Sequence, residues 1–315
     1  MNDTASAPNH IVAAGATGFI GRAVTARLLK HGLHVTILTR GTALKPEAAP
    51  ANLQIVEWKP GDAGDWQHVV READVVINLA GESVAGRRWT SERKTAIMNS
   101  RVDTTKVLVS NMTHGKLVSA SAVGYYGNTG DELALEDRSA GNDFLAHVCS
   151  AWEKAAQSVS NQSVQTVIFR IGIVLGADGG ALPALLQPPF LPFSPWRLGL
   201  GGPLGNGRQW MPWIHVDDVA NAFVEAVLNP RYQGIYNLTA PNPVVNREFS
   251  TVLGEVLKRP AVIPVPAFLL RLLLGEFATT LLGGQRAVPA NLTKSGFLFE
   301  YPHLREALNA ILHND

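Results

Sequence analysis

The stretch His10-Ile-Val-Ala-Ala-Gly15-Ala-Thr-Gly18-Phe-Ile-Gly21 decides the fold that this chain of 315 residues is expected to adopt. An apolar run suited to a strand leads into three spaced glycines, and a helical pattern begins at Gly18 and ends at His31. In such a strand–turn–helix unit, Gly15 lets the chain reverse, Gly18 lets backbone N–H groups approach a pyrophosphate, and Gly21 lets the helix pack on the strand. The stretch therefore predicts the phosphate-binding turn of a dinucleotide site.

Short apolar runs and helical patterns alternate along the rest of the N-terminal half. This alternation indicates right-handed crossovers and a parallel sheet covered by helices on both faces. The sequence thus predicts an α/β fold with a Rossmann-like, doubly wound sheet. The strands expected after the first are His34–Leu38, Leu53–Glu57, Asp74–Leu79, Lys116–Ala120 and Gln165–Ile171, and the later helices are Trp66–Glu72, Thr90–Met112 and Asp143–Ser160.

The pattern changes in the second half of the chain. Residues 179–207 are rich in proline and glycine and are expected to form a long loop without regular elements. We expect residues 8–178, together with 213–240, to form an NADP-binding Rossmann domain. Residues 179–212 and 241–315 should form a substrate-side loop and a smaller, mostly helical C-terminal lobe. The elements expected beyond residue 212 include strands Trp213–His215 and Gly234–Leu238 and helices Asp217–Leu228 and Asn246–Leu257.

Composition excludes several classes of protein. The formal net charge is +1, so no overall field would attract nucleic acid or an anionic membrane, and only a local site could do so. Cys149 is the only cysteine, which rules out an internal disulfide and a cysteine-based zinc site, and we expect no metal. With no signal sequence in Met1–His10, these features favour a cytoplasmic protein. The apolar segment Val262–Leu282 contains charges and prolines, and is expected to be a buried or interfacial helix rather than a segment that contacts a membrane.

The position of Arg40 distinguishes between the two dinucleotides. It follows the second expected strand, 19 residues beyond Gly21, and no Asp or Glu lies between Gly15 and Glu47. An acidic residue at this place binds the ribose 2′-hydroxyl of NAD, whereas a basic residue suits the extra phosphate of NADP. The sequence therefore predicts NADP(H), with Thr39 and Arg40 beside the ribose. The alternative is that Arg40 is a solvated loop residue.

Several segments together form a known pattern. With the glycine turn, they resemble the extended short-chain dehydrogenase/reductase superfamily, of the NAD-dependent epimerase/dehydratase type, over nearly the whole chain. The segments are Asn78-Leu-Ala-Gly81, Ser119-Ala-Ser121-Ala-Val-Gly-Tyr125-Tyr126-Gly127, Arg170-Ile-Gly-Ile-Val-Leu-Gly176 and Trp213-Ile-His215-Val-Asp217-Asp218.

Other segments resemble one atypical subgroup more closely. These "epimerase family" proteins carry a small C-terminal domain of unknown function, and some are labelled cell-division inhibitors. The similar segments are Gly81-Glu82, Arg87-Arg88-Trp89, Ser100-Arg101, residues 201–209 and Pro264-Val-Pro266. The cofactor-binding residues that follow from the glycine turn, the basic positions and the resemblance are Gly15, Thr17, Gly18, Phe19, Ile20, Gly21, Thr39, Arg40, Leu79, Ala80, Gly81 and Arg101.

The superfamily's chemistry implies a Ser/Thr together with a Tyr-x-x-x-Lys pair on a helix, and this chain departs from that pattern. Alignment on Glu153 places Leu145 at the tyrosine position and Cys149 at the lysine position. Leucine has no proton to donate, and cysteine lacks the fixed positive charge that lowers the pKa of a phenol. Any proton transfer must therefore use other residues.

Ser121 and Tyr125 are the expected catalytic residues, with Tyr126 beside them. The alternative for the tyrosines is that they only form a wall of the nicotinamide pocket. His147 and Cys149 lie near the vacated positions and are further candidates for acid–base or nucleophilic chemistry. Cys149 is better explained as a small buried apolar residue.

Four more polar residues are candidates for the site. His215 is expected to orient a loop rather than to react. Arg87, Arg88 and Arg101 follow the segment that lines the cofactor, and they either hold a phosphate or a substrate carboxylate or form a solvated helix start. Arg101 is the one that we expect to contact the cofactor.

These features favour an NADP(H)-binding oxidoreductase or epimerase-like enzyme that acts on a small carbonyl or carbinol compound, including nucleotide-sugar-like ones. Loss of the Tyr-x-x-x-Lys pair favours an alternative, a catalytically impaired regulator that senses NADPH, for example in cell division. A homodimer, or a protein partner in the regulatory case, stays open.

Overall fold

The central sheet has seven parallel strands in the order β11-β7-β5-β4-β1-β2-β3. Winding reverses between β1 and β4, as in a doubly wound sheet, so the predicted α/β, Rossmann-like fold is confirmed. The computed structural model describes residues 8–41, 50–85, 88–159, 161, 163–188 and 191–313. The strands are β1 (His10–Ala14), β2 (His34–Thr39), β3 (Leu53–Glu57), β4 (Val75–Asn78), β5 (Gly115–Ala122), β7 (Val164–Ile171) and β11 (Gly234–Leu238).

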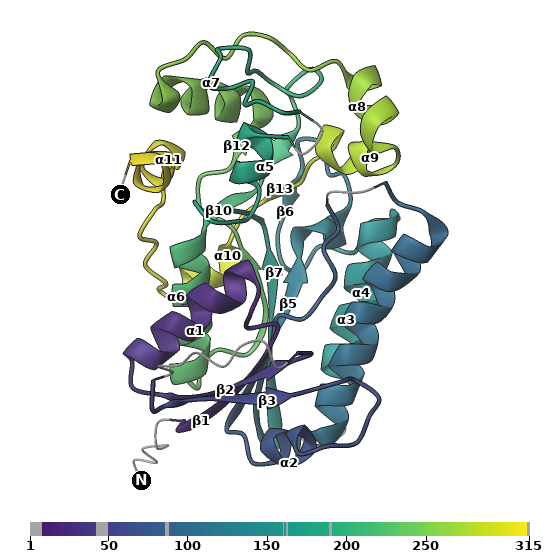
Figure 1. Cartoon of the computed structure of the whole chain (residues 1–315), viewed down its shortest axis with the longest axis vertical. Coiled ribbons are helices and arrows are strands. Elements are labelled where there is room, and N and C mark those ends of the chain that lie inside the picture. Colours follow the sequence, from purple (N-terminus) through teal and green to yellow (C-terminus); the bar gives the residue numbers. More distant parts are fainter. Residues whose placement is uncertain are drawn as a thin grey trace.

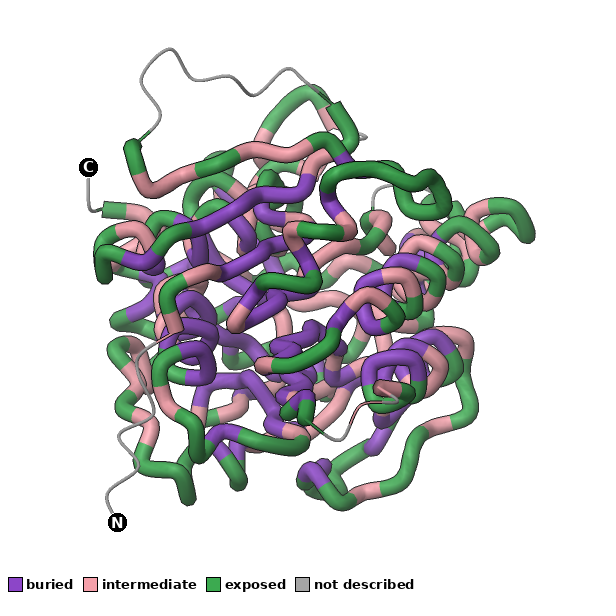
Figure 2. Tube along the Cα trace, turned by 90° about the horizontal axis from the view of Figure 1, so that it is seen from below, coloured by how far each residue is buried: buried purple, intermediate pink, exposed green. Residues whose placement is uncertain are grey.

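Helices cover both faces of the sheet, with α1 and α6 on one side and α3 and α4 on the other (Figure 1). Ile11 and Ala13 of β1 belong to the core that includes α1 and α6, whereas Val12 and Ala14 belong to the core that includes α2 and α3. A strand buried on both faces needs an apolar residue at nearly every position, which explains the continuous apolar run. Figure 2 shows the buried stretches at the centre of the molecule. The helices are α1 (Phe19–Lys30), α2 (Trp66–Arg71), α3 (Ser91–Asn111), α4 (Phe144–Gln157) and α6 (Val216–Leu228).

A second lobe lies over the carboxyl ends of the strands (Figure 1). It has its own core, in which Trp213, Phe249 and Leu308 are almost completely buried. Three short strand pairs form outside the central sheet: β8 (Ile173–Leu175) with β10 (Trp213–His215), β9 (Trp210–Met211) with β12 (Val244–Val245), and β6 (Leu133–Ala134) with β13 (Arg286–Ala287). Its helices are α5 (Leu182–Leu186), α7 (Asn246–Leu257), α8 (Ala267–Leu274), α9 (Phe277–Leu282) and α11 (Leu304–His313).

Three expectations for the second half need correction. The proline-rich loop contains α5, which has a proline at its start, where proline is compatible with a helix. Helix α10 (Ala290–Lys294) packs on β11 through Leu292, so this part of the chain returns to the sheet. The segment Val262–Leu282, expected to be one buried or interfacial helix, is divided at Gly275 into α8 and α9, and α8 is largely exposed. Within the described ranges, no helix is long and apolar enough to cross a membrane.

Candidate active site

The turn between β1 and α1 is packed so closely that only glycine fits at two of its positions. Gly15 has a φ of +78°, and a Cβ atom there would lie 2.5 Å from the carbonyl carbon of Leu79. A Cβ atom at Gly21 would lie 2.3 Å from the carbonyl oxygen of Gly15. The turn therefore contacts both the end of β4 and the start of α1, which holds the helix N-terminus at the switch point of the sheet.

The first turn of α1 presents unpaired backbone donors. Gly18 is the N-cap and has no side-chain acceptor, and Arg22 N makes the first intrahelical hydrogen bond, to Gly18 O over 2.9 Å. The N–H groups of Phe19, Ile20 and Gly21 have no acceptor among the described residues, and this turn carries no acidic side chain. Such a helix start attracts anions through its N–H groups and its dipole, so it fits the pyrophosphate of a dinucleotide.

Thr17 and Phe19 lie in different surroundings. Thr17 is exposed at the turn, and its backbone oxygen accepts a hydrogen bond from Arg22 Nη1 over 3.0 Å. The ring of Phe19 instead faces three glycines, where an added Cβ atom would lie between 2.5 and 2.9 Å from it. The start of the substrate-side loop therefore rests directly on the cofactor-side turn. These glycines are Gly176, Gly179 and Gly180.

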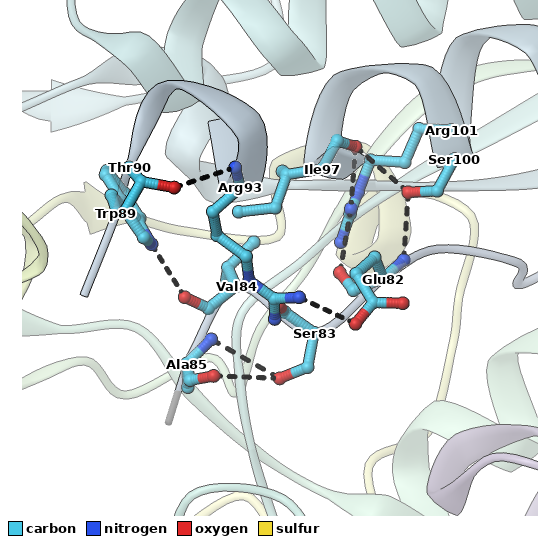
Figure 3. Close-up of polar contacts among 10 residues, drawn as sticks. All are labelled: Glu82, Ser83, Val84, Ala85, Trp89, Thr90, Arg93, Ile97, Ser100 and Arg101. Atoms are coloured by element: carbon cyan, nitrogen blue, oxygen red, sulfur yellow. Dashed lines mark hydrogen bonds and ion pairs between the residues drawn. The ribbon is translucent and has the colours of Figure 1, made fainter. Parts of the chain in front are cut away.

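The loop after β4 is fastened to α3 by a set of hydrogen bonds (Figure 3). Glu82 N donates to Ser100 Oγ over 3.0 Å, and Glu82 O accepts from Arg101 Nη1 over 2.9 Å. Arg93 Nη1 pairs with the Glu82 carboxylate at 2.7 Å, and this hydrogen bond is the main cause that lowers the pKa of Glu82. Arg93 also donates to the backbone oxygen of Ser83. The protein itself thus fixes the shape of this loop.

Leu79, Ala80 and Gly81 connect β4 to that loop. Ala80 N donates to the side chain of Asn78 over 3.2 Å, and Asn78 is completely buried. A Cβ atom at Gly81 would lie 3.0 Å from the guanidinium carbon of Arg101. Glycine at this position therefore allows the arginine to cross the loop.

Arg101 extends from α3 towards α4. Its guanidinium carbon lies 5.2 Å from the centre of the Trp152 ring, and its charge opposes the rise that burial causes in the pKa of Cys149. Burial lowers the pKa of Arg101 itself. Within the described residues only Nη1 has partners, the backbone oxygens of Glu82 and Ile97, so the other nitrogens can bind a ligand.

Thr39 is the last residue of β2 and Arg40 follows it, at the same edge of the sheet as the Gly15 turn, because β1 and β2 pair in parallel. Arg40 is exposed. After the hydrogen bond from Arg93, its positive charge is one of the causes that lower the pKa of Glu82. The predicted NADP-selective arginine therefore lies near the loop that is predicted to line the cofactor.

Ser121 lies near the carboxyl end of β5 and is 3% exposed. Its hydroxyl donates to Glu153 Oε1 over 2.6 Å. Arg170 holds the same carboxylate through Nε at 2.9 Å and Nη2 at 2.8 Å, and both partners are buried. This bidentate pair fixes the carboxylate that accepts from Ser121, and Ser121 also lies within hydrogen-bonding reach of the buried Cys149 sulfur.

The two tyrosines of the 3₁₀ helix η1 (Val123–Tyr126) differ in their hydrogen bonds. Tyr126 donates to Asn237 Oδ1 over 2.6 Å and accepts from Arg170 Nη1 over 2.9 Å, and burial raises its pKa to about 12. The ring of Tyr125 lies 3.5 Å from the guanidinium carbon of Arg170, and its hydroxyl has no partner among the described residues. Tyr125 is therefore the tyrosine with an available hydroxyl.

The positions of the absent Tyr-x-x-x-Lys pair lie on α4, next to η1. A Cβ atom at Gly124 would lie 3.3 Å from the Cβ of Leu145 and 3.9 Å from the sulfur of Cys149. Cys149 is buried, as expected for a small apolar residue, and burial raises its pKa to about 12. Its thiol is therefore protonated at neutral pH, which argues against nucleophilic chemistry. His147 is exposed on the other side of α4.

The remaining candidates lie further from the turn. His215 accepts a hydrogen bond at Nδ1 from Asp217 N over 3.1 Å, which caps α6 and agrees with an orienting role. Arg88 donates to Leu272 O over 3.1 Å and so contacts the C-terminal lobe. Arg87 is outside the described residues. In the part of the chain that the structure describes, no group of three or more His, Cys, Asp or Glu could hold a metal ion.

Sequence reasoning missed the residues that hold the site together. Arg170 lies in an apolar strand, and a charge in such a position signals a buried partner, which here is Glu153. Asn237 donates to Ala134 O and Val288 O, and accepts from Tyr126. Arg93 fastens the Glu82 loop, and nothing in its local sequence distinguishes it from a solvated helix residue.

Comparisons with known proteins identify the family of the chain. Residues 11–239 match the model of the "NAD dependent epimerase/dehydratase family", and residues 265–311 match a "Domain of unknown function (DUF1731)". The chain is 41% identical to "Epimerase family protein SDR39U1 homolog, chloroplastic" of Arabidopsis thaliana, over 95% of this chain and 85% of that protein. It is 38% identical to epimerase family protein YfhF of Bacillus subtilis, over 96% of this chain and 98% of that protein.

A solved structure of similar length also matches. The crystal structure of human epimerase family protein SDR39U1 with NADPH has a TM-score of 0.83 and 31% identity, and the match covers 97% of this chain and 99% of that one. Because the plant relative is described as chloroplastic, the cytoplasmic location expected from the sequence stays a prediction.

Proposed function

Because the chain belongs to the NAD-dependent epimerase/dehydratase family, we propose that it binds NADP(H) and transfers a hydride at a carbonyl or carbinol carbon of a small molecule. One observation carries the proposal. The unpaired N–H groups of the first turn of α1 follow β1, and the unshared hydroxyl of Tyr125 follows β5, at the same edge of the sheet. An anion site and a proton donor at this edge suit dinucleotide-dependent chemistry. The NADPH in the human relative supports the choice of cofactor.

The cofactor would lie along the turn and the loop after β4. The N–H groups of Phe19, Ile20 and Gly21 would hold the pyrophosphate, next to Thr17 and Gly18. Arg40, beside Thr39, would bind the ribose 2′-phosphate by a charge-assisted hydrogen bond. The backbone of Leu79, Ala80 and Gly81 would line the opposite side, where the packing around Gly15 leaves no room for side chains.

Arg101 would take over the positive charge that the missing lysine supplies in the superfamily. Its free guanidinium nitrogens lie between Gly81 and the α4 face that carries Cys149 and Trp152. We infer that they bind the part of the cofactor beyond the pyrophosphate, on the nicotinamide side. The charge would then come from α3 instead of α4.

When bound, NADP(H) supplies or accepts the hydride. Tyr125 would give a proton to the substrate oxygen as the carbonyl carbon is reduced, and would take it back in the reverse direction. Ser121, whose own proton is engaged by Glu153, would accept a hydrogen bond from a substrate hydroxyl. The buried guanidinium of Arg170 under the Tyr125 ring would keep that side chain in place. Hydride return to the opposite face would give an epimerase; a nucleotide-sugar-like substrate stays one candidate.

The same hydrogen bonds also favour a second candidate, a regulator that senses NADPH. Ser121 is buried and its proton is committed to Glu153, and no lysine supports a tyrosine on α4. A protein with this arrangement can bind the cofactor yet turn over slowly or not at all. Its output would then be a partner that recognises only the cofactor-loaded form.

Fluorescence titration with NADPH, NADH and the fragment 2′,5′-ADP tests cofactor binding. We expect NADPH to bind at least about tenfold more tightly than NADH. Arg40→Gln should weaken NADPH and 2′,5′-ADP by about 10–100-fold and leave NADH unchanged. Arg101→Gln should weaken NADPH and NADH but not 2′,5′-ADP. Arg231→Gln, at an exposed arginine before β11, is the control. Tighter binding of NADH than NADPH would contradict the NADP(H) assignment.

A screen of carbonyl compounds with stereospecifically deuterated NADPH tests hydride transfer. Deuterium in a product supports the enzyme. If every compound leaves the deuterium in place, and a partner binds only the NADPH-loaded protein, the regulator is the better explanation.

A further inference from the structure

Helix α8 presents an apolar face to solvent. Seven of its eight residues, AFLLRLLL, are apolar, and only Leu270 is buried. Phe268 and Leu272 are 70% and 66% exposed, and their spacing of four residues puts them on the same face of the helix. An exposed apolar surface of this kind marks a place where the protein meets a partner or a membrane.

Two segments that neighbour each other carry further exposed apolar side chains. Ile263 N donates to Gly201 O over 3.1 Å, and Arg259 Nε donates to Arg197 O over 3.0 Å, so these segments lie side by side. Residues 259–265 then lead directly into α8. The exposed apolar side chains of the three segments are called the apolar patch, and its main members are Leu198, Leu200, Val262, Ile263, Phe268 and Leu272.

Four cations lie in the same stretches of the chain as the apolar patch: Arg197, Lys258, Arg259 and Arg271. All four are exposed, and none forms an ion pair with a described residue. Segments 191–205 and 256–275 contain these cations and no Asp or Glu. Glu255 and Glu276 flank these segments, but each forms an ion pair elsewhere, with Arg305 and Lys94, so the four unpaired cations give this surface a positive charge.

We propose that this surface docks on an anionic lipid bilayer, with the apolar patch in the membrane interface and the four cations at the headgroups. Apolar side chains beside a basic rim are the combination that holds peripheral proteins on anionic membranes. At 1.5 Å per residue α8 is about 12 Å long, so it would lie in the interface, since a span needs about 30 Å.

A second copy of the chain fits this surface less well. A two-fold contact through the apolar patch would bring the rim of one copy against the rim of the other. With four unpaired cations and no acidic residue in the contributing segments, the contact would set like charges against each other. Anionic headgroups supply the complementary charge. This proposal is independent of the hydride-transfer proposal, because none of its residues belongs to the candidate active site.

Flotation of the full chain with lipid vesicles tests the proposal. Vesicles of phosphatidylcholine alone are compared with vesicles containing 30% phosphatidylglycerol, at low and high salt. We expect binding to the anionic vesicles only, and weaker binding at high salt. Arg259→Gln and Arg271→Gln should each reduce the partition coefficient about fivefold, from about 1 kcal/mol per cation. Phe268→Ser with Leu272→Ser should reduce it at least about tenfold.

Leu298→Ser is the matched control, since Leu298 is 86% exposed but lies outside the apolar patch. It should bind vesicles like the parent chain, and all variants should keep the parent's melting temperature because the changed side chains are exposed. Sedimentation of the same variants without lipid detects self-association. The proposal is overturned if the parent does not float with anionic vesicles, or floats equally with neutral ones. A dimer that the Phe268 and Leu272 changes dissociate, without vesicle binding, would assign the surface to a second copy instead.

Discussion

The guanidinium carbon of Arg170 lies 3.5 Å from the centre of the Tyr125 ring, while its three nitrogens bind Glu153 and the hydroxyl of Tyr126. One buried cation therefore organises both tyrosines of η1. It uses a hydrogen bond of Tyr126, but it meets Tyr125 only through the ring face and leaves that hydroxyl free. Two adjacent phenols are thus expected to have different roles, one in chemistry and one in structure.

Tyr125→Phe should lower turnover by about 10²–10⁴-fold, the usual contribution of a general acid–base residue, with little change in the free energy of unfolding. Tyr126→Phe should lower the free energy of unfolding by about 1–3 kcal/mol, because it leaves buried groups of Asn237 and Arg170 without a partner. Steady-state kinetics, with a substrate found in the deuterium screen, and urea unfolding measure the two effects. Equal losses of turnover and stability in both variants would contradict this division.

Breaking the buried pair of Glu153 and Arg170 should strongly destabilise the protein, because it leaves a buried charge without a partner. Glu153→Gln leaves the Arg170 charge uncompensated, and we expect it to lower the free energy of unfolding by about 3–5 kcal/mol. Adding Arg170→Met should recover part of this loss, since the unpaired charge is then removed. The exposed pair of Arg138 and Glu132, at 2.7 Å, is the control: Glu132→Gln should cost less than about 1 kcal/mol. Urea unfolding that ranks the two glutamine variants equally would refute the assignment.

The fold was predictable because its signals are local. A strand, the glycine turn and an amphipathic helix follow one another within residues 10–31, and the later strands and helices repeat that alternation. The network around Arg170 has no such signal. Ser121 is 32 residues from Glu153, and Tyr126 is 111 residues from Asn237, so only the folded sheet brings these pairs together.

Apolar composition also misled at one place for a physical reason. An apolar run such as 262–282 indicates that its side chains will be shielded from water, and burial in the interior of the same chain is the usual way. In the folded protein, the prolines before α8 and the break at Gly275 separate the run into two short helices, and the first of these contributes only Leu270 to the interior. The sequence indicates that these apolar side chains should be shielded from water, but not whether other parts of the same chain shield them.

Substitutions at Gly15 and Gly32 can be compared to distinguish the cost of backbone strain from the cost of steric contact. Both have a φ of +78°, but a Cβ atom at Gly32 would meet nothing within 4 Å, whereas one at Gly15 would lie 2.5 Å from Leu79. Gly32→Ala should therefore cost only the left-handed penalty, about 1–2 kcal/mol, and keep NADPH affinity. Gly15→Ala should cost more and weaken NADPH binding at least about tenfold, because the turn must move away from β4. Similar stability and affinity of the two variants would show that the turn tolerates displacement.

A cluster of titratable groups joins α6 to the C-terminal segment. Asp218 is completely buried and accepts hydrogen bonds from the N–H groups of Glu300 and Tyr301, and burial raises its pKa to about 6. Burial lowers the pKa of His215, against the opposing charges of Asp217 and Glu300. Folding therefore raises the proton affinity of Asp218 and lowers that of His215.

Their effects on stability have opposite signs between about pH 4 and 6.5. Folded Asp218 binds its proton more readily than the unfolded chain, so its contribution falls as pH rises from about 4 to 6, by up to about 3 kcal/mol. Folded His215 resists protonation, so its contribution is lost as pH falls below about 6.5.

Asp218→Asn should therefore lose stability relative to the parent as pH falls from 6.5 to 4.5. His215→Asn, which keeps a side-chain acceptor for the start of α6, should gain stability relative to the parent over the same range. Urea unfolding of the parent and both variants at each pH gives these differences, in which the contributions of the other titrating groups cancel. Parallel pH profiles of the two variants would show that neither residue changes its proton affinity on folding.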